Sequence, residues 1–158
     1  MLDHLRAQGF TERELLAAGL ARLTRRGTPI DTFRDRLMFT VREASGAAAG
    51  FIGRAAPAAG PEVPKYLNTA ETALYRKGDL LFGLTEQRDA FLAAARPVLV
   101  EGPMDVLAVA ATPGSGSALS AAVAPCGTAL TAAHVELLGT VAAREQGVLV
   151  AGEIRRRS

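Results

Sequence analysis

The sequence predicts an α/β chain in two parts: a small mixed sheet with flanking helices in residues 1–95, and an incomplete parallel sheet in residues 96–158. In the first part, short β-prone runs flank a Ser45-Gly46 turn signal, which is typical of a hairpin. In the second part, strand-like and helix-like segments alternate, which favours parallel strands covered by helices. Hydrophobic residues make up 49% of the 158 residues, enough for a packed core.

The first part begins with a predicted helix over Thr11–Leu23. Thr11 and Glu14 have the spacing of a capping box, in which each side chain binds the other residue's backbone N–H. Thr85 is expected to cap a later helix. The remaining expected elements, in chain order, are a turn around Pro29, a strand in the second half of Phe33–Val41, a partner strand at Ala49–Arg54, a loop at Pro57–Pro64, an irregular polar stretch at Lys65–Asp79 and a helix at Thr85–Ala95.

The composition changes at Arg96, where the second part begins. Pro103 follows a tight turn and stands where the first turn of a helix tolerates proline. His134, on the last predicted helix, has no Cys or Asp partner nearby and is expected at or near the surface. The expected elements are strands at Pro97–Val100, Leu119–Val123 and Val148–Val150, with helices at Met104–Ala111 and Thr131–Val141.

Composition excludes several classes of site. A single cysteine, Cys126, rules out an intrachain disulfide, and with two histidines it also rules out a Cys/His zinc site. Any metal ion must therefore be a hard cation held by carboxylates. No apolar run approaches the roughly 18 residues of a membrane span, and the charged start of the chain lacks the apolar segment of a signal peptide. We expect a cytoplasmic protein with no membrane partner.

The segment from Val98 to Asp105 carries the sharpest chemical signal. Glu101 stands at the carboxyl end of a predicted parallel strand, where ligands collect in open α/β sheets. Asp105 lies one helical turn further on, so both carboxylates can project to one side. Such a pair suits Mg²⁺, which keeps waters and substrate phosphates as its other ligands. The spacing also fits a structural interpretation, in which Glu101 interacts with the helix dipole and Asp105 is a solvated first-turn acid.

A basic set in the first half of the chain is the second signal. Cationic side chains beside an aromatic ring can follow a single-stranded phosphate backbone. Acidic residues are interleaved with them, so an ordinary mixed surface is the alternative, and the formal charge of +2 limits any nucleic-acid contact to a local patch. The set is Arg34, Arg36, Arg42, Arg54, Lys65, Arg76 and Lys77, with Tyr66 beside Lys65.

Five segments, in the same order, resemble the catalytic core of bacterial DnaG-type primases. One such motif would be weak, whereas five in order are specific. Thr40 is a departure, because it stands where the family's arginine-framed strand usually has proline. The segments are Arg34–Arg42, Gly50–Arg54, Pro64–Thr69 with Glu71-Thr72, Lys77-Gly78 and Leu81–Leu84, Val100–Val106, and Gly127–Thr131.

The resemblance implies a nucleotidyltransferase of DNA replication that copies single-stranded DNA into short RNA primers from nucleoside triphosphates, using Mg²⁺ or Mn²⁺. Residues 1–95 would be the N-terminal subdomain of the core, and residues 96–158 a TOPRIM domain. Glu101 and Asp105 would be catalytic and metal-binding. A helicase or a complementing chain would be further partners. The residues assigned to nucleic acid or nucleotide are Arg34, Arg54, Lys65, Tyr66, Asn68 and Lys77.

The second part also departs from the family. Its third strand should end in an Asp-x-Asp pair, but Glu153 falls near the first position and Arg155 occupies the second, where it would repel a cation. We therefore expect a truncated TOPRIM domain, with Glu153 as a third metal ligand in a weak or incomplete site. Two rival functions follow: a non-catalytic remnant that binds single-stranded DNA, and a TOPRIM nuclease.

Overall fold

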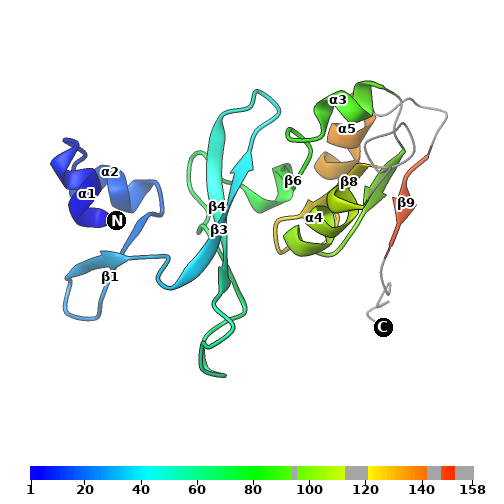
Figure 1. Cartoon of the computed structure of the whole chain (residues 1–158). Coiled ribbons are helices and arrows are strands. Elements are labelled where there is room, and N and C mark those ends of the chain that lie inside the picture. The colour runs from blue at the N-terminus through cyan, green and yellow to red at the C-terminus, as the bar shows by residue number, and fades with distance from the viewer. Residues whose placement is uncertain (94–95, 113–120, 142–146, 152–158) are drawn as a thin grey trace. The chain divides into compact units, whose positions relative to one another are not determined.

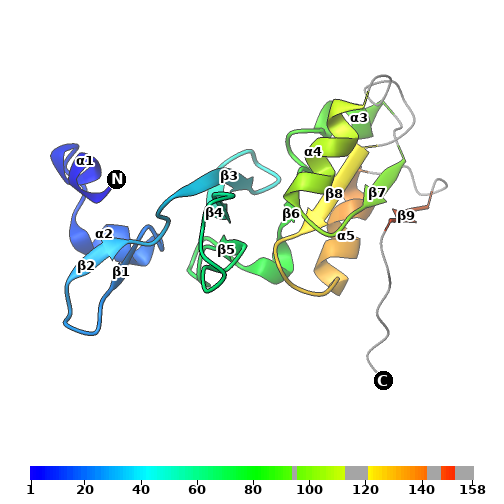
Figure 2. The same ribbon diagram turned by 60° about the horizontal axis from the view of Figure 1, so that its bottom comes forward.

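The computed structural model describes residues 1–93, 96–112, 121–141 and 147–151 (Figures 1 and 2). The chain forms two compact units. The first contains Met1–Val41 and Ala48–Arg76, and the second contains Arg42–Ala47 and the chain from Lys77 onward. Within the described residues, no helix is both long enough and apolar enough to cross a bilayer. The mixed α/β class predicted from the sequence is confirmed.

The first unit begins with two short helices, α1 (Leu2–Ala7) and α2 (Glu12–Ala17). The predicted capping box is present at α2: the Thr11 backbone N donates to Glu14 Oε2 at 2.7 Å, and the Glu14 backbone N donates to Thr11 Oγ1 at 3.3 Å. The Thr11 hydroxyl, which donates to Glu14 Oε2 at 2.6 Å, and secondly the Thr11 backbone N–H lower the pKa of the exposed Glu14 carboxyl.

The predicted helix Thr11–Leu23 was wrong in its last part. The chain leaves the helix at Gly19, whose φ of +70° disfavours any residue with a side chain. It then forms β1 (Ala21–Leu23), which pairs antiparallel with β2 (Pro29–Asp31). Pro29 is therefore the start of a strand, and the turn precedes it. Pairing with β2, which begins six residues after β1 ends, outweighed local helical propensity here.

The second sheet of the first unit has the order β3-β4-β5. Its strands β3 (Arg36–Arg42) and β4 (Ala48–Ala55) form the predicted hairpin around Gly46. The irregular stretch predicted from Lys65 was wrong at β5 (Tyr66–Asn68), which pairs antiparallel with β4. Gly50 allows the close packing beneath this sheet, because a Cβ there would collide with the buried Tyr75 ring.

The second unit contains a four-stranded sheet in the order β6-β8-β7-β9. β7 is parallel to both β8 and β9, as the alternating sequence predicted, and β6 adds an antiparallel edge strand. The elements are the 3₁₀ turn η1 (Lys77–Asp79), β6 (Leu81–Phe82), α3 (Arg88–Leu92), β7 (Pro97–Leu99), α4 (Pro103–Ala111), β8 (Ala121–Pro125), α5 (Ala132–Val141) and β9 (Leu149–Val150).

The two crossover helices cover opposite faces of this sheet (Figures 1 and 2). From β7 the chain passes through α4 to β8 on one side, and from β8 it passes through α5 to β9 on the other side. Right-handed crossovers in opposite directions require opposite faces. On the α5 face, Phe91 and Leu138 pack with Leu99 and Val123.

Two local predictions in the second unit were wrong. Thr85 does not cap α3. Its Oγ1 donates to the Glu43 carbonyl at 2.9 Å, and Gln87 is the N-cap residue. His134 was expected at or near the surface and is completely buried. It has the polar partners that a buried imidazole requires, which the sequence pattern around it did not reveal.

Candidate nucleic-acid interface and metal site

Three of the residues predicted to bind nucleic acid come together on β4 and β5. Arg54 and Tyr66 are opposite each other in the antiparallel register. The Arg54 guanidinium carbon lies 5.9 Å from the centroid of the Tyr66 ring, and Lys65 Nζ lies 5.8 Å from it. These distances are within the range of cation–π attraction. We call Arg54, Lys65 and Tyr66 the Tyr66 cluster.

Backbone pairing holds the Tyr66 cluster in place. The Ala55 backbone N donates to the Lys65 carbonyl at 2.9 Å, which continues the β4–β5 ladder past Tyr66. Tyr66 is half-buried, and Lys65 is exposed. Asn68, another predicted contact residue, lies on the same short strand opposite Ile52 and is also half-buried. The pairing of β4 with β5 thus holds the Tyr66 ring close to the positive charges of Arg54 and Lys65.

Arg36 anchors the segment that leads into this cluster. One of its guanidinium nitrogens, Nη1, donates to the Pro64 carbonyl at 2.8 Å and to the Gly53 carbonyl at 3.2 Å. Gly53 makes room for it, because a Cβ there would stand 2.8 Å from Arg36 Cδ and 2.9 Å from Phe33 Cδ1. The sequence assigned Arg36 to the general basic set. In the structure its guanidinium is hydrogen-bonded to backbone carbonyls, which is a structural role.

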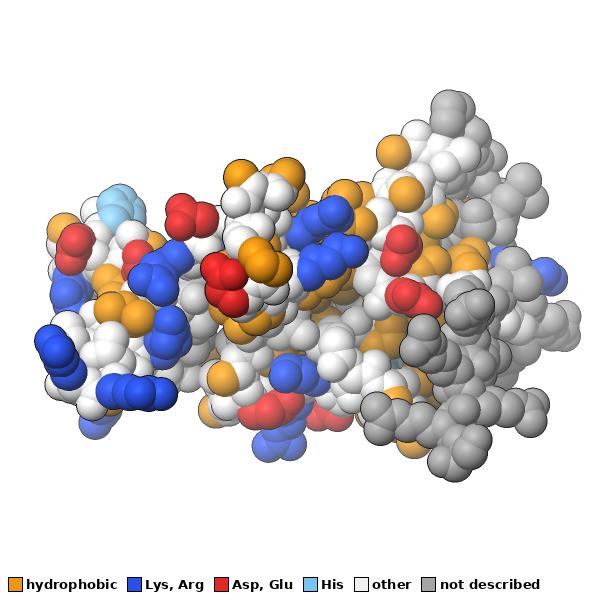
Figure 3. Space-filling view, turned by 90° about the horizontal axis from the view of Figure 1, so that it is seen from below, with side chains coloured by type: hydrophobic (Ala, Val, Ile, Leu, Met, Phe, Trp, Pro, Cys, Tyr) orange, Lys and Arg blue, Asp and Glu red, His pale blue; other side chains and the backbone are white. Residues whose placement is uncertain are grey.

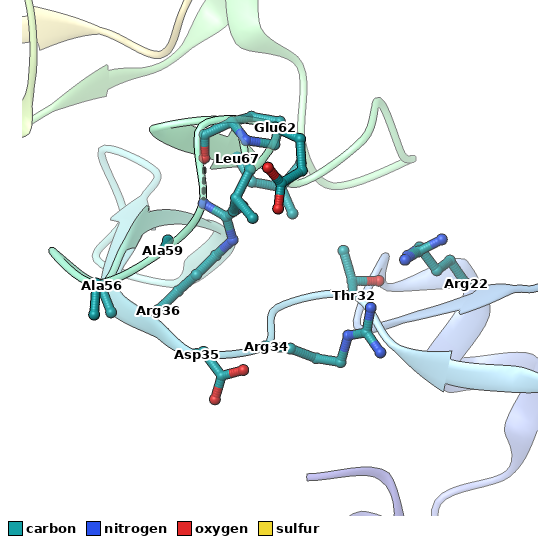
Figure 4. A pocket seen from close by; sticks show the side chains of 12 residues that line it. Arg22, Thr32, Arg34, Asp35, Arg36, Ala56, Ala59, Glu62 and Leu67 are labelled. Atoms are coloured by element: carbon teal, nitrogen blue, oxygen red, sulfur yellow. Dashed lines mark hydrogen bonds between the residues drawn. The ribbon is translucent and has the colours of Figure 1, made fainter.

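Beside Arg36 the first unit has a cleft of about 690 Å³, which we call the arginine cleft (Figure 4). Arg22, Thr32 and Arg34 line one side, and the loop that carries Glu62 lines another. Arg34 was predicted as a contact residue. Arg22 was missed, because it was placed in a helix whereas it lies on β1. The other lining residues are Asp35, Arg36, Ala56, Ala58, Ala59, Val63, Pro64 and Leu67.

The basic residues are mixed with acidic ones where they can be seen together. On the face that Figure 3 presents, Lys and Arg side chains are interspersed with Asp and Glu side chains. Asp35 lies between Arg34 and Arg36 along the chain, and its φ of 51° is the only positive value among the non-glycine residues that the structure describes. Aspartate tolerates this backbone conformation better than most residues. A phosphate-binding surface here would be local, as the small net charge predicted.

The remaining predicted residues belong to the second unit. Lys77 is the first residue of η1 and is half-buried. Glu101 directly follows Val100, at the carboxyl end of β7, and is exposed. Asp105 lies in the first turn of α4. Because the chain leaves β7 and β8 toward opposite faces, Glu101 stands at the point in an open α/β sheet where ligands usually bind.

The two acids have different surroundings. Asp105 Oδ2 accepts a hydrogen bond from the Gly102 backbone N at 3.1 Å, so this carboxylate caps α4. Glu101 makes no hydrogen bond or ion pair with the residues that the structure describes. Asp105 is therefore an exposed acid in the first turn of α4 that also caps the helix, which agrees with the structural interpretation left open by the sequence and leaves its second oxygen accessible.

This pair fits a hydrated cation better than a closed metal site. Among the described residues, no three His, Cys, Asp or Glu side chains lie close enough to hold a metal ion. Glu153, the third predicted ligand, lies outside the described residues. Mg²⁺ is often bound through one or two carboxylates, with waters and substrate phosphates completing its shell. Glu101 and the second oxygen of Asp105 could serve in that way.

A family model described as the DNA primase catalytic core, N-terminal domain, matches residues 1–88. The chain belongs to this primase family. It is 41% identical over 140 residues to a DNA primase of Streptomyces coelicolor, which covers 86% of this chain and 21% of that protein. The chain therefore spans about a fifth of the length of this relative. The resemblance inferred from the five sequence motifs is confirmed.

Solved structures agree with the family assignment. The RNA polymerase domain of Mycobacterium tuberculosis primase DnaG, in complex with a double-stranded DNA oligomer with a 6-nucleotide overhang, is 36% identical with a TM-score of 0.75. The match covers 89% of this chain and 42% of that one. A DnaG primase catalytic domain bound to single-stranded DNA is 36% identical with a TM-score of 0.70, covering 87% of this chain and 41% of that one.

These matches favour a primase-like protein over a TOPRIM nuclease. The start of a TOPRIM domain at residue 96 stays a prediction, because the family model ends at residue 88 and residues from Lys77 onward belong to the second compact unit. The individual roles predicted for Arg34, Arg54, Lys65, Tyr66 and Asn68 stay predictions too, as do those of Lys77, Glu101, Asp105 and Glu153.

Proposed function

We propose that this chain is a primase-like protein of DNA replication that binds single-stranded DNA through its first unit and a metal–nucleotide complex through its second. The main support is the Tyr66 cluster, where two cations surround one aromatic ring on a fixed strand pair. A base can stack on such a ring while neighbouring cations neutralise backbone phosphates. Because the chain belongs to the primase family, we propose single-stranded DNA as the ligand of this cluster.

The template would follow the basic residues of the first unit. Tyr66 would stack against a base, and Arg54 and Lys65 would contact the phosphates on either side of it. Arg34, exposed in the arginine cleft, would provide a further phosphate contact, and Asn68 a polar contact from the same strand as Tyr66. Because all of these contacts are made to the backbone or to the face of a base, we expect little sequence preference.

The nucleoside triphosphate would be bound by the second unit. Glu101 and Asp105 would hold Mg²⁺ or Mn²⁺, which supplies Lewis-acid activation of the α-phosphate and neutralises charge on the departing pyrophosphate. Lys77 would contact the triphosphate or the template with its ammonium group. In the family's role in replication, a helicase would be a further partner.

We infer that the described residues bind single-stranded DNA and nucleotide but do not by themselves form a complete catalytic site. Nucleotidyl transfer needs several acids beneath the triphosphate, and the described residues offer two, one of which also caps a helix. A complementing chain, or Glu153, would have to supply the others. Single-stranded DNA binding without catalysis is therefore kept as the second candidate function.

Binding can be tested with a fluorescently labelled oligo-dT and the full chain, by anisotropy over a range of salt concentrations. Lys65→Ala should weaken binding and reduce the slope of log K against log salt by about 0.7, because one phosphate contact is lost. Arg13→Ala is the matched control, since it removes one positive charge from an exposed position on α2 in the same unit. Equal slopes for Lys65→Ala, Arg13→Ala and the parent would refute the DNA-binding role of the cluster.

Catalysis needs a separate test, because it can fail while DNA binding succeeds. Incorporation of labelled nucleoside triphosphates on single-stranded template should require Mg²⁺ or Mn²⁺ and be abolished by Glu101→Gln. If the parent binds template but makes no primer under any metal condition, the non-catalytic alternative is favoured. Cleavage of DNA without nucleotides would instead restore the nuclease interpretation.

A further inference from the structure

The first turn of α5 contains a capping arrangement with a histidine in an unusual role. Thr131 precedes the helix, and its Oγ1 accepts a hydrogen bond from the His134 backbone N at 3.1 Å. In return, the Thr131 backbone N donates to His134 Nδ1 at 3.2 Å. This is the reciprocal geometry of a capping box, with an imidazole in the place that glutamate or glutamine usually takes.

Each of these two side chains has one further hydrogen-bonding direction, and both are directed to the same turn. Thr131 Oγ1 donates to the Gly78 carbonyl at 2.6 Å, and His134 Nε2 lies 3.0 Å from the Lys77 carbonyl. The cap of α5 therefore holds two consecutive carbonyls of η1. We call the four bonds made by Thr131 and His134 the η1 clamp.

The hydrogen bonds define the form of the imidazole. Nδ1 accepts from a backbone N–H, so it carries no hydrogen, and the hydrogen of the neutral ring must be on Nε2. Nε2 is then a donor, which is what the Lys77 carbonyl requires. The ring is completely buried, so neither of these bonds can be exchanged for a bond to bulk water without opening the structure.

The segment held by the clamp is fixed on its other side as well. Leu80 and Leu81 follow η1 directly and are buried, at 6% and 2% exposure. Lys77 thus begins a turn whose backbone is held by α5 and whose next residues enter the core. A capping box without a further function needs only the two bonds within α5. The two bonds to η1 satisfy the remaining polar atoms of Thr131 and the buried His134, and they also tie α5 to the backbone that carries Lys77.

We propose that His134 is a positioning residue that fixes the backbone of Lys77, so that its ammonium group is presented in one orientation to a phosphate. Thr131 contributes through the neighbouring carbonyl of Gly78. This inference rests on the proposed role of Lys77 in binding nucleotide or template. A lysine on a fixed backbone loses less conformational entropy when it binds than one on a mobile loop.

Two substitutions of the histidine separate its two bonds. In His134→Asn, the amide oxygen occupies the place of Nδ1, so the cap is retained and the donor to Lys77 is lost. In His134→Gln, the amide nitrogen can reach the place of Nε2, so the donor to Lys77 is retained. A merely structural histidine would give variants that differ in melting temperature but bind alike once folded.

The experiment measures affinity for labelled oligo-dT and for a nucleoside triphosphate in the presence of Mg²⁺, well below the melting temperature of each full-length variant. His134→Asn should bind at least one of these ligands about three- to tenfold more weakly, and His134→Gln within about twofold of the parent. The loss of affinity in Lys77→Ala gives the largest effect that His134→Asn should have. The double variant His134→Asn/Lys77→Ala should bind no more weakly than Lys77→Ala alone, because the histidine acts through the lysine.

Several outcomes would overturn the inference. Parental affinity for His134→Asn alongside weakened Lys77→Ala would do so, as would losses that add in the double variant. If His134→Asn does not fold, Thr131→Val takes its place with the same expectations, because it keeps the side-chain shape but removes both the donor to Gly78 and the acceptor for the His134 backbone N. Parental affinity of Lys77→Ala for both ligands would instead reject the proposed role of Lys77. In that case, amide hydrogen exchange at residues 78–80 still tests whether the clamp holds η1. Exchange rates in His134→Asn equal to those of the parent would show that it does not.

Discussion

Arg34 and Arg36 are two residues apart, carry the same charge and line the same cleft, yet the structure predicts opposite consequences for their loss. Arg36 Nη1 bonds to the carbonyls of Gly53 and Pro64. Arg34 is exposed and makes no hydrogen bond or ion pair with the described residues. Arg36→Ala should therefore reduce the stability of the fold, whereas Arg34→Ala should reduce only DNA binding.

The size of the stability effect follows from the two bonds. A hydrogen bond with a charged partner contributes about 1.5–3 kcal/mol when it is well protected. Here one nitrogen serves both carbonyls, and the Arg36–Pro64 bond is exposed to water, so we expect about 1–3 kcal/mol in total for Arg36→Ala. For a chain of this size, that corresponds to a decrease in melting temperature of about 3–10 °C.

The assay is thermal unfolding followed by circular dichroism, with Arg36→Ala, Arg34→Ala and Arg36→Lys measured side by side. Arg36→Lys should be intermediate, because an ammonium keeps the charge but lacks the fixed geometry of the guanidinium. Gly53→Ala should also destabilise, since its Cβ would push against the Arg36 side chain. Equal melting temperatures for Arg34→Ala and Arg36→Ala would refute the assignment of Arg36 as a structural residue.

Three further predictions concern the template contact, the acids and a helix cap. Tyr66→Leu should weaken oligo-dT binding by about 1–3 kcal/mol and Tyr66→Phe much less, because stacking depends on the ring; equal losses in anisotropy titrations would contradict stacking. Glu101→Gln should weaken Mn²⁺ binding in calorimetry with an unchanged melting temperature, whereas Asp105→Ala should also lower stability by about 0.5–2 kcal/mol through loss of the α4 cap. Because the pKa of Glu14 is lowered in the folded chain, its contribution to stability is present above the usual glutamate pKa and lost as the pH falls through the lowered value. Thr11→Ala should remove that pH dependence, which can be checked by measuring the free energy of unfolding of parent and variant over the acidic pH range. A difference in unfolding free energy that is the same at every pH would contradict the prediction.

The sequence alone determined features that depend on neighbours along the chain. The capping box at Thr11 and Glu14, the hairpin around Gly46 and the alternation that forms the parallel sheet were all predicted. The family was also predicted from the sequence, because the order of the five motifs along the chain can be recognised without knowing how they pack. Local propensity and hydrophobic periodicity are sufficient to predict caps, turns and individual strands and helices, because the interactions that create them lie within a few residues. The alternation of strands and helices then favours a parallel sheet, although its strands pair over more than twenty residues.

Only the tertiary structure decided which of several similar residues serves the fold. The sequence contained no sign that Arg36 bonds to Pro64, that β1 replaces the end of a helix, or that His134 is buried against Lys77. Each of these contacts joins residues at least six positions apart, across strands or between a helix and a turn. A side chain's partners at that separation depend on how the elements pack, and packing is a property of the whole unit that no local pattern contains.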